Sequence, residues 1–288
     1  MSVSKVKSSL VKQKIEHKLG NVMAHVLGYV LFVIYIIPVV LIVIFSFTDS
    51  QSIASATIHL DSFTLENYRR LFTTMSAFKP YLVSILYAAA ASVAVVALAL
   101  FASRILHKHQ NSKRAAVLEY ALLIPWILPS TLIAIGLVVT YNVPRLITGN
   151  TILTGTLWLL LIGYIIIHIP FTMRMVKASF FSLDRNLEDA STNLGAKSFY
   201  TFRKVLLPII LPSTLAVLAL NFIKILDDYD LTVFLYHPLY QTLGPVIKSA
   251  TDAQAGVGAR AMSLVYSVVL MIMSGITMYF VYGRGKKE

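Results

Sequence analysis

Long apolar runs alternate with short charged segments along the whole of this chain. Each run is long enough for a helix that crosses the hydrocarbon core of a bilayer, which takes about 20 residues. A membrane-spanning β-barrel would instead show alternating polar and apolar positions in segments of about ten residues. The pattern therefore predicts an all-α polytopic membrane protein with six transmembrane helices. They are expected at residues 23–47, 81–103, 117–141, 151–175, 205–226 and 260–282.

Composition agrees with a membrane protein. Of the 288 residues, 57% are hydrophobic and only 13% are charged, whereas a soluble domain is usually about 45–50% apolar and about 25% charged. The chain contains no cysteine, which excludes disulfide bonds and thiol chemistry. Paired prolines in the third and fifth predicted spans mark either hinges or curved helix packing. These pairs are Pro125 with Pro129, and Pro208 with Pro212.

The first 22 residues differ from the rest because five lysines alternate with apolar residues at roughly helical spacing. This pattern is typical of a basic amphipathic helix on a membrane surface; a disordered basic tail is the alternative. The apolar run that follows is longer than the 7–15 residues of a signal-peptide core, so we expect a retained span. We therefore divide the chain into an amphipathic cytoplasmic segment, 1–22, and a six-helix transmembrane domain, 23–283.

The net charge of +12 is distributed unevenly. With a cytoplasmic N-terminus, eighteen of the 25 Lys and Arg residues fall on the cytoplasmic side, while the acidic residues divide almost evenly. Membrane proteins carry such an excess of Lys and Arg in their cytoplasmic loops. Both termini and residues 176–204 are therefore expected in the cytoplasm. Because this distribution accounts for all the excess charge, nucleic acid is excluded as a partner.

The segment from Leu187 to Pro212 has more internal order than a simple connecting loop needs. The stretch LEDASTNL has the character of a short helix, and Gly195 interrupts it. Ser198 stands where its side chain can cap a second helix, which runs without a polar break into the fifth span. The predicted order of helix, glycine turn, helix and membrane span indicates a projecting hairpin that docks in a cleft on another protein.

The spacing inside this segment carries a resemblance to a known family. Asp189-Ala190-Ser191 is followed by three residues, Gly195, nine residues and Val205-Leu206-Leu207-Pro208. This resembles the signature of permease subunits of binding-protein-dependent ATP-binding-cassette (ABC) importers with the type I fold. That signature is Glu-Ala-Ala, three residues, Gly, nine residues and Ile-x-Leu-Pro, so Asp, Ser and Val are departures. FTLENYRRLF and LIPWILPS also look like family segments, and the resemblance covers most of residues 24–283.

The resemblance implies that residues 184–204 form coupling helices, which in this family dock on an ATPase subunit. A short peg needs a rigid turn, and glycine adopts a positive φ more easily than other residues. Small alanines permit close approach, and aromatic side chains can anchor in a partner's pockets. The expected coupling residues are Glu188, Asp189, Ala190, Ser191, Gly195, Ala196, Phe199, Tyr200, Phe202 and Pro208.

The resemblance also implies the partners and the location. The expected partners are two ATP-binding subunits, a second permease subunit that is homologous or identical, and an extracytoplasmic solute-binding protein. The chain has no phosphate-binding loop, no Cys/His metal set and no catalytic arrangement. We therefore expect no enzyme activity and no cofactor in this chain, with ATP and Mg on the partner ATPase. The implied location is the bacterial cytoplasmic membrane.

An acidic cluster at the outer end of the fifth span is the candidate contact for the solute. It comprises Asp227, Asp228, Tyr229 and Asp230. Ionisable groups near membrane depth are costly and often mark a solute path, and the cluster resembles the equivalent place in polyamine permeases. A polyamine-like cation is favoured, although ferric-iron, thiamine and phosphonate permeases share the general pattern. Docking of the binding protein, or a pair between Lys224 and Asp228, is the alternative.

Three other classes of protein fit this sequence less well. An ion-driven secondary transporter is the main alternative, and it would need buried acids or inverted repeats within its spans. The predicted spans are nearly free of acids. A membrane-embedded enzyme lacks a catalytic cluster here, and a purely structural subunit would not predict the spacing of the signature.

Overall fold

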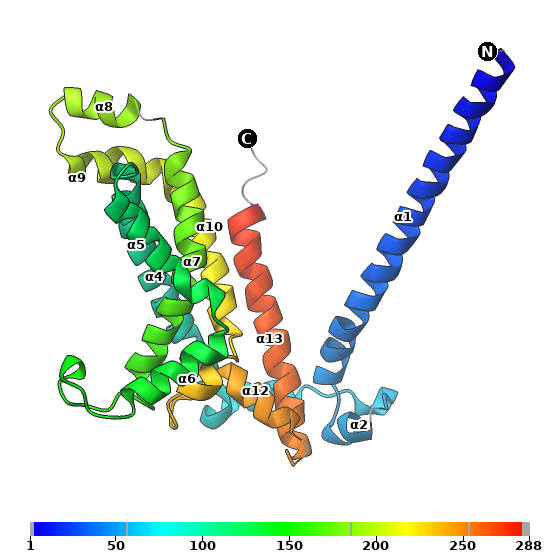
Figure 1. The fold of residues 1–288 in the computed structure, drawn as a ribbon. Helices are drawn as coiled ribbons and strands as arrows, with labels where there is room; N and C mark the ends of the chain where they lie inside the picture. The colour runs from blue at the N-terminus through cyan, green and yellow to red at the C-terminus, as the bar shows by residue number, and fades with distance from the viewer. Residues whose placement is uncertain (1–2, 56, 185, 253, 284–288) are drawn as a thin grey trace.

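The computed structural model describes residues 3–55, 57–184, 186–252 and 254–283, and helices dominate this part of the chain (Figure 1). The helices are α1 (Val3–Ser46), α2 (Ser50–Ser55), α3 (Glu66–Thr73), α4 (Met75–Lys108), α5 (Lys113–Leu123), α6 (Ser130–Tyr141), α7 (Leu157–Phe181), α8 (Asn186–Asn193), α9 (Ser198–Thr201), α10 (Leu207–Leu226), α11 (Thr232–Leu235), α12 (Leu243–Thr251) and α13 (Val257–Tyr282). Short 3₁₀ turns are η1 (Leu60–Ser62), η2 (Ile124–Ile127) and η3 (Leu146–Thr148), and η4 (Phe202–Leu206) is a π-helical turn.

Five of the six predicted spans are confirmed as single helical stretches long and apolar enough to cross a membrane. Two of them, α7 and α13, are complete helices in the structure. The stretch Gly20–Ser46 is the second half of α1, and α4 extends past its expected span at both ends. The fifth span runs through α9, η4 and α10 as one stretch of 29 residues, Ser198–Leu226.

The third predicted span is not a straight helix. Its two halves, α5 with η2 and then α6, are bent by 103° at a short break. Leu128 is extended there (φ −96°, ψ 138°) and the next residue is Pro129. A proline disfavours helical geometry in the residue before it, because its ring collides with that residue's backbone. The prolines of LIPWILPS therefore mark a break, so of the two predicted alternatives this span has the hinge and not a curved helix.

Helix α4 lies at the centre of the bundle, where it packs against α7 and α10. Its small residues Ala88 and Ala91 are fully buried, as the alanine-rich sequence indicates. Small side chains let two helix backbones approach closely in a membrane, where packing and hydrogen bonds hold helices together. Next to them, Leu159, Leu160 and Tyr164 of α7 complete the main core cluster.

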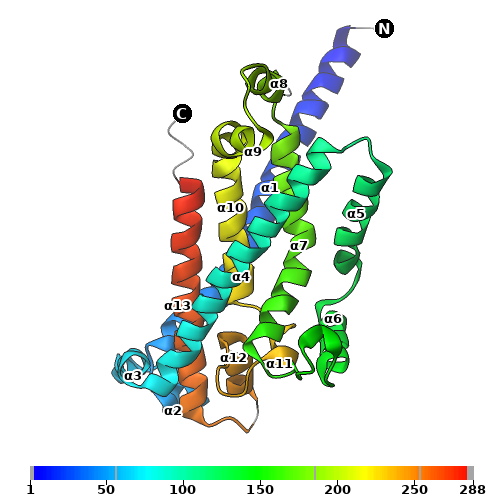
Figure 2. The ribbon, with the colours of Figure 1, turned by 90° about the vertical axis from the view of Figure 1, so that its left-hand side faces the viewer.

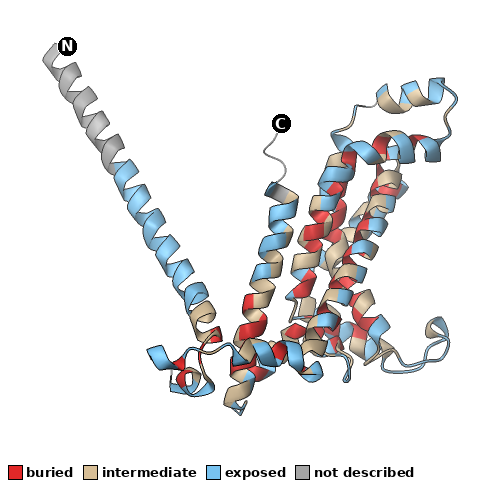
Figure 3. Ribbon diagram, turned by 180° about the vertical axis from the view of Figure 1, so that it is seen from behind, coloured by how far each residue is buried: buried red, intermediate tan, exposed pale blue. Residues whose placement is uncertain are grey.

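Helix α1 stands apart from this bundle over most of its length (Figures 1 and 3). Its described stretch Gly20–Ser46 has no buried residue in its most apolar window. Its lower end is tied to α3, because the Asn67 side-chain amide donates to the Thr48 carbonyl at 2.8 Å. The Tyr68 hydroxyl also lies 2.7 Å from Ser46 Oγ. The described part of the helix is therefore anchored at its lower end.

The amphipathic segment 1–22 continues into the first span, because residues 3–46 form one helix. Side chains before Gly20 lie outside the described part of the structure, so a surface position for this segment stays a prediction. The two ends of the bundle are distinct: α8 and α9 cap one end, while α2, α3 and α12 gather at the opposite end (Figure 2).

Candidate functional site

Two short helices, α8 and α9, form a hairpin that projects beyond the spans (Figure 1). Gly195 lies between them with φ +82°, in the left-handed region. The Gly195 N–H donates to the Thr192 carbonyl at 2.9 Å, and the Ala196 N–H donates to the Ser191 carbonyl at 3.1 Å. These bonds satisfy carbonyl groups at the end of α8, as a glycine at this position commonly permits. The predicted glycine turn is confirmed.

Side-chain bonds also hold the hairpin together. Ser191 Oγ on α8 lies 2.8 Å from Thr201 Oγ1 on α9. Ser198 does not cap α9, which is a correction: the capping residue is Lys197, and Ser198 is the first residue of the helix. The Ser198 hydroxyl is instead within 3.4 Å of Nη2 of Arg104, from the end of α4. The hairpin is therefore fixed both internally and to the bundle.

The outer surface of the hairpin presents apolar side chains to its surroundings. Leu194 is 88% exposed and Phe199 is 73% exposed, and Tyr200 is also exposed. A hollow of about 730 Å³ lies between the two helices. Exposed apolar patches of this kind mark interaction surfaces. Among the residues that line the hollow are Ala190, Ser191, Gly195, Ala196 and Tyr200.

Three expected coupling residues lie away from this surface. Phe202 packs against Phe180 of α7, with ring centroids 6.4 Å apart, so its expected role as a surface anchor is corrected. Pro208 is on α10, just after the π-helical turn. Glu188 turns toward the bundle and pairs with Arg104, whereas its neighbour Asp189 is exposed in the first turn of α8.

The acidic cluster after α10 divides into residues with different surroundings. Asp228 accepts hydrogen bonds from the Thr232 N–H at 3.1 Å and the Thr232 hydroxyl at 2.6 Å. The same hydroxyl lies 2.7 Å from the Tyr164 hydroxyl of α7. Burial raises the pKa of the Asp228 carboxyl above its usual range. Asp228 therefore holds α11 against α7.

Asp227 instead borders a hollow of about 280 Å³ beside α12 and α13. Tyr229 and Lys248 line the same hollow, and Asp230 is exposed nearby. Burial raises the pKa of the Asp227 carboxyl as well. The expected alternative of a Lys224–Asp228 pair is wrong among the described residues, because the Lys224 ammonium lies over the Phe171 ring at 4.0 Å.

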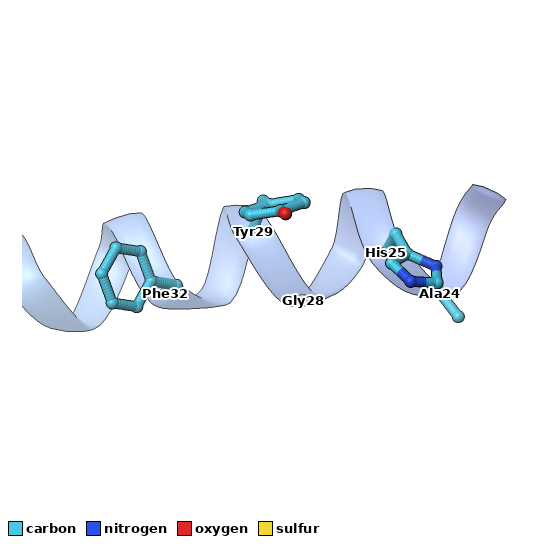
Figure 4. Close-up of a pocket in the computed structure, with 5 residues that line it drawn as sticks. All are labelled: Ala24, His25, Gly28, Tyr29 and Phe32. Carbon is cyan, nitrogen blue, oxygen red and sulfur yellow. The ribbon is translucent and has the colours of Figure 1, made fainter. Parts of the chain in front are cut away.

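A third hollow lies along one face of α1 (Figure 4). Gly28 leaves a gap there between the side chains of Tyr29 and His25, with Ala24 and Phe32 at the two ends. Nδ1 of the His25 ring lies 2.6 Å from the Asn21 carbonyl oxygen of its own helix, within hydrogen-bond distance. Small residues spaced by four positions are typical of surfaces where membrane helices meet.

Comparison with known proteins places this architecture in a family. A family model described as "Binding-protein-dependent transport system inner membrane component" matches residues 96–284, which include α8 and α9. The chain belongs to this family. It is thus a multi-pass inner-membrane component of the ABC importer permease type, as its signature indicates.

Relatives and solved structures agree with this placement. A probable ABC transporter permease protein of Sinorhizobium fredii is 33% identical over 94% of this chain and 47% of its own length. A putative 2-aminoethylphosphonate transport system permease protein of Salmonella paratyphi A is 26% identical over 52% of this chain and 55% of its own length. The chain spans about half the length of these relatives. A chain of a bacterial ABC transporter that imports alginate shares the fold, with a TM-score of 0.69 at 15% identity, covering 92% and 96% of the two chains.

Two features of the site could not be found from the sequence. The partner of Glu188 is Arg104, which lies far away in the chain at the end of the second span. The separation of Asp227 from Asp228 depends on which way each side chain turns. Neither feature has a local sequence signal, because both are set by contacts between elements distant in the chain.

Proposed function

We propose that this chain is one of two permease subunits in an ATP-driven importer of a small charged solute. The observation that carries the proposal is the α8–α9 hairpin, a fixed projection with exposed Leu194 and Phe199. It is joined without a break to the span Ser198–Leu226. A partner ATPase that binds this hairpin acts directly on a membrane helix, and ATP with Mg belongs to that partner.

The proposed cycle uses the ATPase as the ligand that changes the conformation of the permease. A ligand shifts a conformational equilibrium only through its different affinity for the two states. Closure of two ATP-binding subunits pulls the hairpins of two permease subunits, which alternately open their shared cavity to either side. In this scheme α8 and α9 face the cytoplasm and an extracytoplasmic protein delivers the solute at the opposite end.

A second permease subunit is supported by two observations. The apolar stretch Gly20–Ser46 of α1 has faces that no other described residue covers (Figure 3). In addition, the Sinorhizobium fredii relative matches nearly this whole chain with less than half of its own length. A chain twice as long has room for two permease units, which supports the pairing of two such units.

For the solute, we propose a small charged molecule, with a polyamine-like cation preferred. Asp227 borders the outer hollow, and the lysine in that hollow, Lys248, lies 3.9 Å from Asp252. That pairing leaves the hollow with acidic character. Relatives are named for spermidine/putrescine, 2-aminoethylphosphonate and ferric iron, so their names do not single out one cargo.

The test of the coupling role uses Gly195. Valine is strained at φ +82°, at a cost of about 1–3 kcal/mol, whereas asparagine tolerates the left-handed region better. Since no atom lies within 4 Å of a Cβ added at this glycine, the effect is conformational rather than a collision. We expect Gly195→Val to reach the membrane but to lose solute uptake, while Gly195→Asn retains most of it.

The measurement is made on the tagged chain purified with its natural partners. Co-purified ATPase is quantified first, and the solute is then identified by a thermal-shift screen of the binding protein. ATP hydrolysis and uptake of that solute are compared in vesicles. Normal uptake by Gly195→Val, or the absence of any ATPase from the wild-type complex, would overturn the proposed function.

A further inference from the structure

A basic side chain at the end of α4 contacts the hairpin. Nη2 of Arg104 forms an ion pair with Oε1 of Glu188 on α8. The same nitrogen lies 3.4 Å from Ser198 Oγ on α9. A single guanidinium group therefore contacts both helices of the hairpin, and it does so from an element that is neither before nor after them in the chain.

This contact is largely removed from solvent. The side chain of Arg104 is 15% exposed and that of Glu188 is 28% exposed. Nη1 of Arg104 is buried and makes no hydrogen bond to any described residue. The charge of the guanidinium group is thus balanced mainly by Glu188, and losing one partner leaves the other charge partly desolvated. Such a pair resists being pulled apart more than an exposed pair does.

Neighbouring residues on α4 make the contact stiff. The side chain of His107 is 8% exposed, and its Nε2 lies 3.8 Å from Oε2 of Glu188. The imidazole packs edge-on against Phe181, with ring centroids 5.3 Å apart. On the other side of Arg104, the Ser103 hydroxyl donates to the Met173 carbonyl of α7 at 3.3 Å. The end of α4 is therefore fixed to α7 at the point where it contacts the hairpin.

We propose that Arg104 is a positioning residue that joins the coupling hairpin to α4, so that hairpin and α4 move as one body. The inference rests on the proposed coupling function and adds a route for the motion. Without this residue, a force on α8 and α9 reaches the bundle mainly through the chain ends, at α7 and α10, and α4 keeps the longer contact of 3.8 Å between His107 and Glu188. With it, the force is delivered directly to α4, the helix at the centre of the core.

The alternative is that Arg104 only stabilises the folded hairpin. The two roles differ in what a charge exchange does. Arg104→Glu places two carboxylates together and separates hairpin from α4, whereas Arg104→Glu combined with Glu188→Arg restores an attractive pair. Lys108→Glu is the matched control, because it makes the same charge change one turn later, on an exposed side chain that forms no ion pair with the described residues.

The experiment measures the distance between hairpin and α4 in the whole complex. Spin labels are placed on cysteines at Asn111, which follows α4, and at Asn186, which begins α8; both positions are exposed and the chain has no native cysteine. Double electron–electron resonance is recorded without nucleotide and after trapping with Mg-ATP and vanadate. We expect one narrow distance in both states for the wild type and Lys108→Glu.

For Arg104→Glu we expect a broadened distance that changes on trapping, together with loss of uptake and retention of the co-purified ATPase. The charge exchange should restore the narrow distance and part of the uptake. A wild-type distance in both states of Arg104→Glu would overturn the inference and leave the docking role intact. If no ATPase co-purifies with the wild type, the proposed function fails, yet the nucleotide-free distances still decide whether Arg104 holds the hairpin.

Discussion

At the scale of single residues, adjacent side chains with the same chemistry have different tasks. Asp227 borders a hollow, whereas Asp228 accepts two hydrogen bonds from Thr232 and holds α11. Gly244 of α12 lies so close to the Asp228 carbonyl that an added Cβ would overlap it. The backbone around Asp228 is therefore tightly enclosed, and a change there affects folding before it affects transport.

Substitution of these two aspartates should separate stability from transport. Asp228→Ala removes both bonds to Thr232 and should lower the free energy of unfolding by about 1 kcal/mol. Asp227→Asn should leave thermal stability unchanged and reduce uptake of a cationic solute. Thermal unfolding of the purified complex and uptake in vesicles check the two outcomes. Equal stability of Asp228→Ala and wild type would contradict the role assigned to Asp228.

Asp228 also makes the stability of the protein depend on pH. Because burial raises the pKa of the Asp228 carboxyl, the folded state favours its protonated form. Its contribution to stability is complete below the ordinary value of 3.8 and is lost as the pH rises through the higher folded-state value. Asp228→Asn removes this dependence on pH. The melting temperature of Asp228→Asn, relative to that of wild type, should therefore rise as the pH increases from 3.8 through the folded-state pKa of Asp228. Asp61→Asn, at an exposed position outside this cluster, is the control and should show no such gain.

At the scale of elements, the broken third span shows how prolines decide helix geometry. Leu128 is extended immediately before Pro129, and α5 and α6 meet at 103°. The two halves also have partners of their own: Lys177 of α7 lies 2.5 Å from Glu119 of α5, while α6 packs against α11. Both the proline geometry and these contacts hold the bend.

Replacement of Pro125 and Pro129 by alanine tests which of the two causes dominates. Spin labels at Ala116 and Thr140 would be about 36 Å apart in a continuous helix, at 1.5 Å per residue, and closer in the bent form. We expect the double substitution to shift part of the population toward the long distance, because it removes the restriction on Leu128. An unchanged distance distribution would mean that tertiary contacts alone maintain the bend.

At the scale of the whole molecule, charge and shape agree on two distinct ends. Lys and Arg residues flank α9, at Lys197, Arg203 and Lys204, and they also flank the connection from Lys108 of α4 to Lys113 of α5. These elements share one end of the molecule (Figure 2). The opposite end carries α2, α3 and α12. If the basic end faces the cytoplasm, the hairpin is on the side where ATP is available.

Labelling of single cysteines tests this orientation. We expect a membrane-impermeant maleimide, added outside intact cells with a permeabilised outer envelope, to modify Asp61→Cys and to spare Asn111→Cys. Both positions are exposed, and they lie at opposite ends of the molecule. Disruption of the cells should make Asn111→Cys reactive, which controls for its accessibility. Labelling of Asn111→Cys in intact cells would reverse the orientation.

Most of the fold could be predicted because its causes are local. Apolar runs predict membrane spans because unpaired polar groups are costly in lipid, so that only helices with apolar side chains are stable there. The spacing around Gly195 predicts the hairpin because glycine adopts a positive φ easily. Five spans and the glycine turn are confirmed on this basis. The sequence left a hinge and a curved helix both open at Pro125 and Pro129, because the same residues permit either geometry.

The sequence by itself determined the class of protein, the number of apolar segments and the coupling motif, since each depends on residues close together in the chain. Only the tertiary structure decided that Phe202 is packed inside while Phe199 is exposed, that Glu188 meets Arg104, and that Asp228 is structural. The physical reason is that burial and ion pairing depend on which distant helices meet. The local sequence around a residue does not identify the distant residue that it will contact.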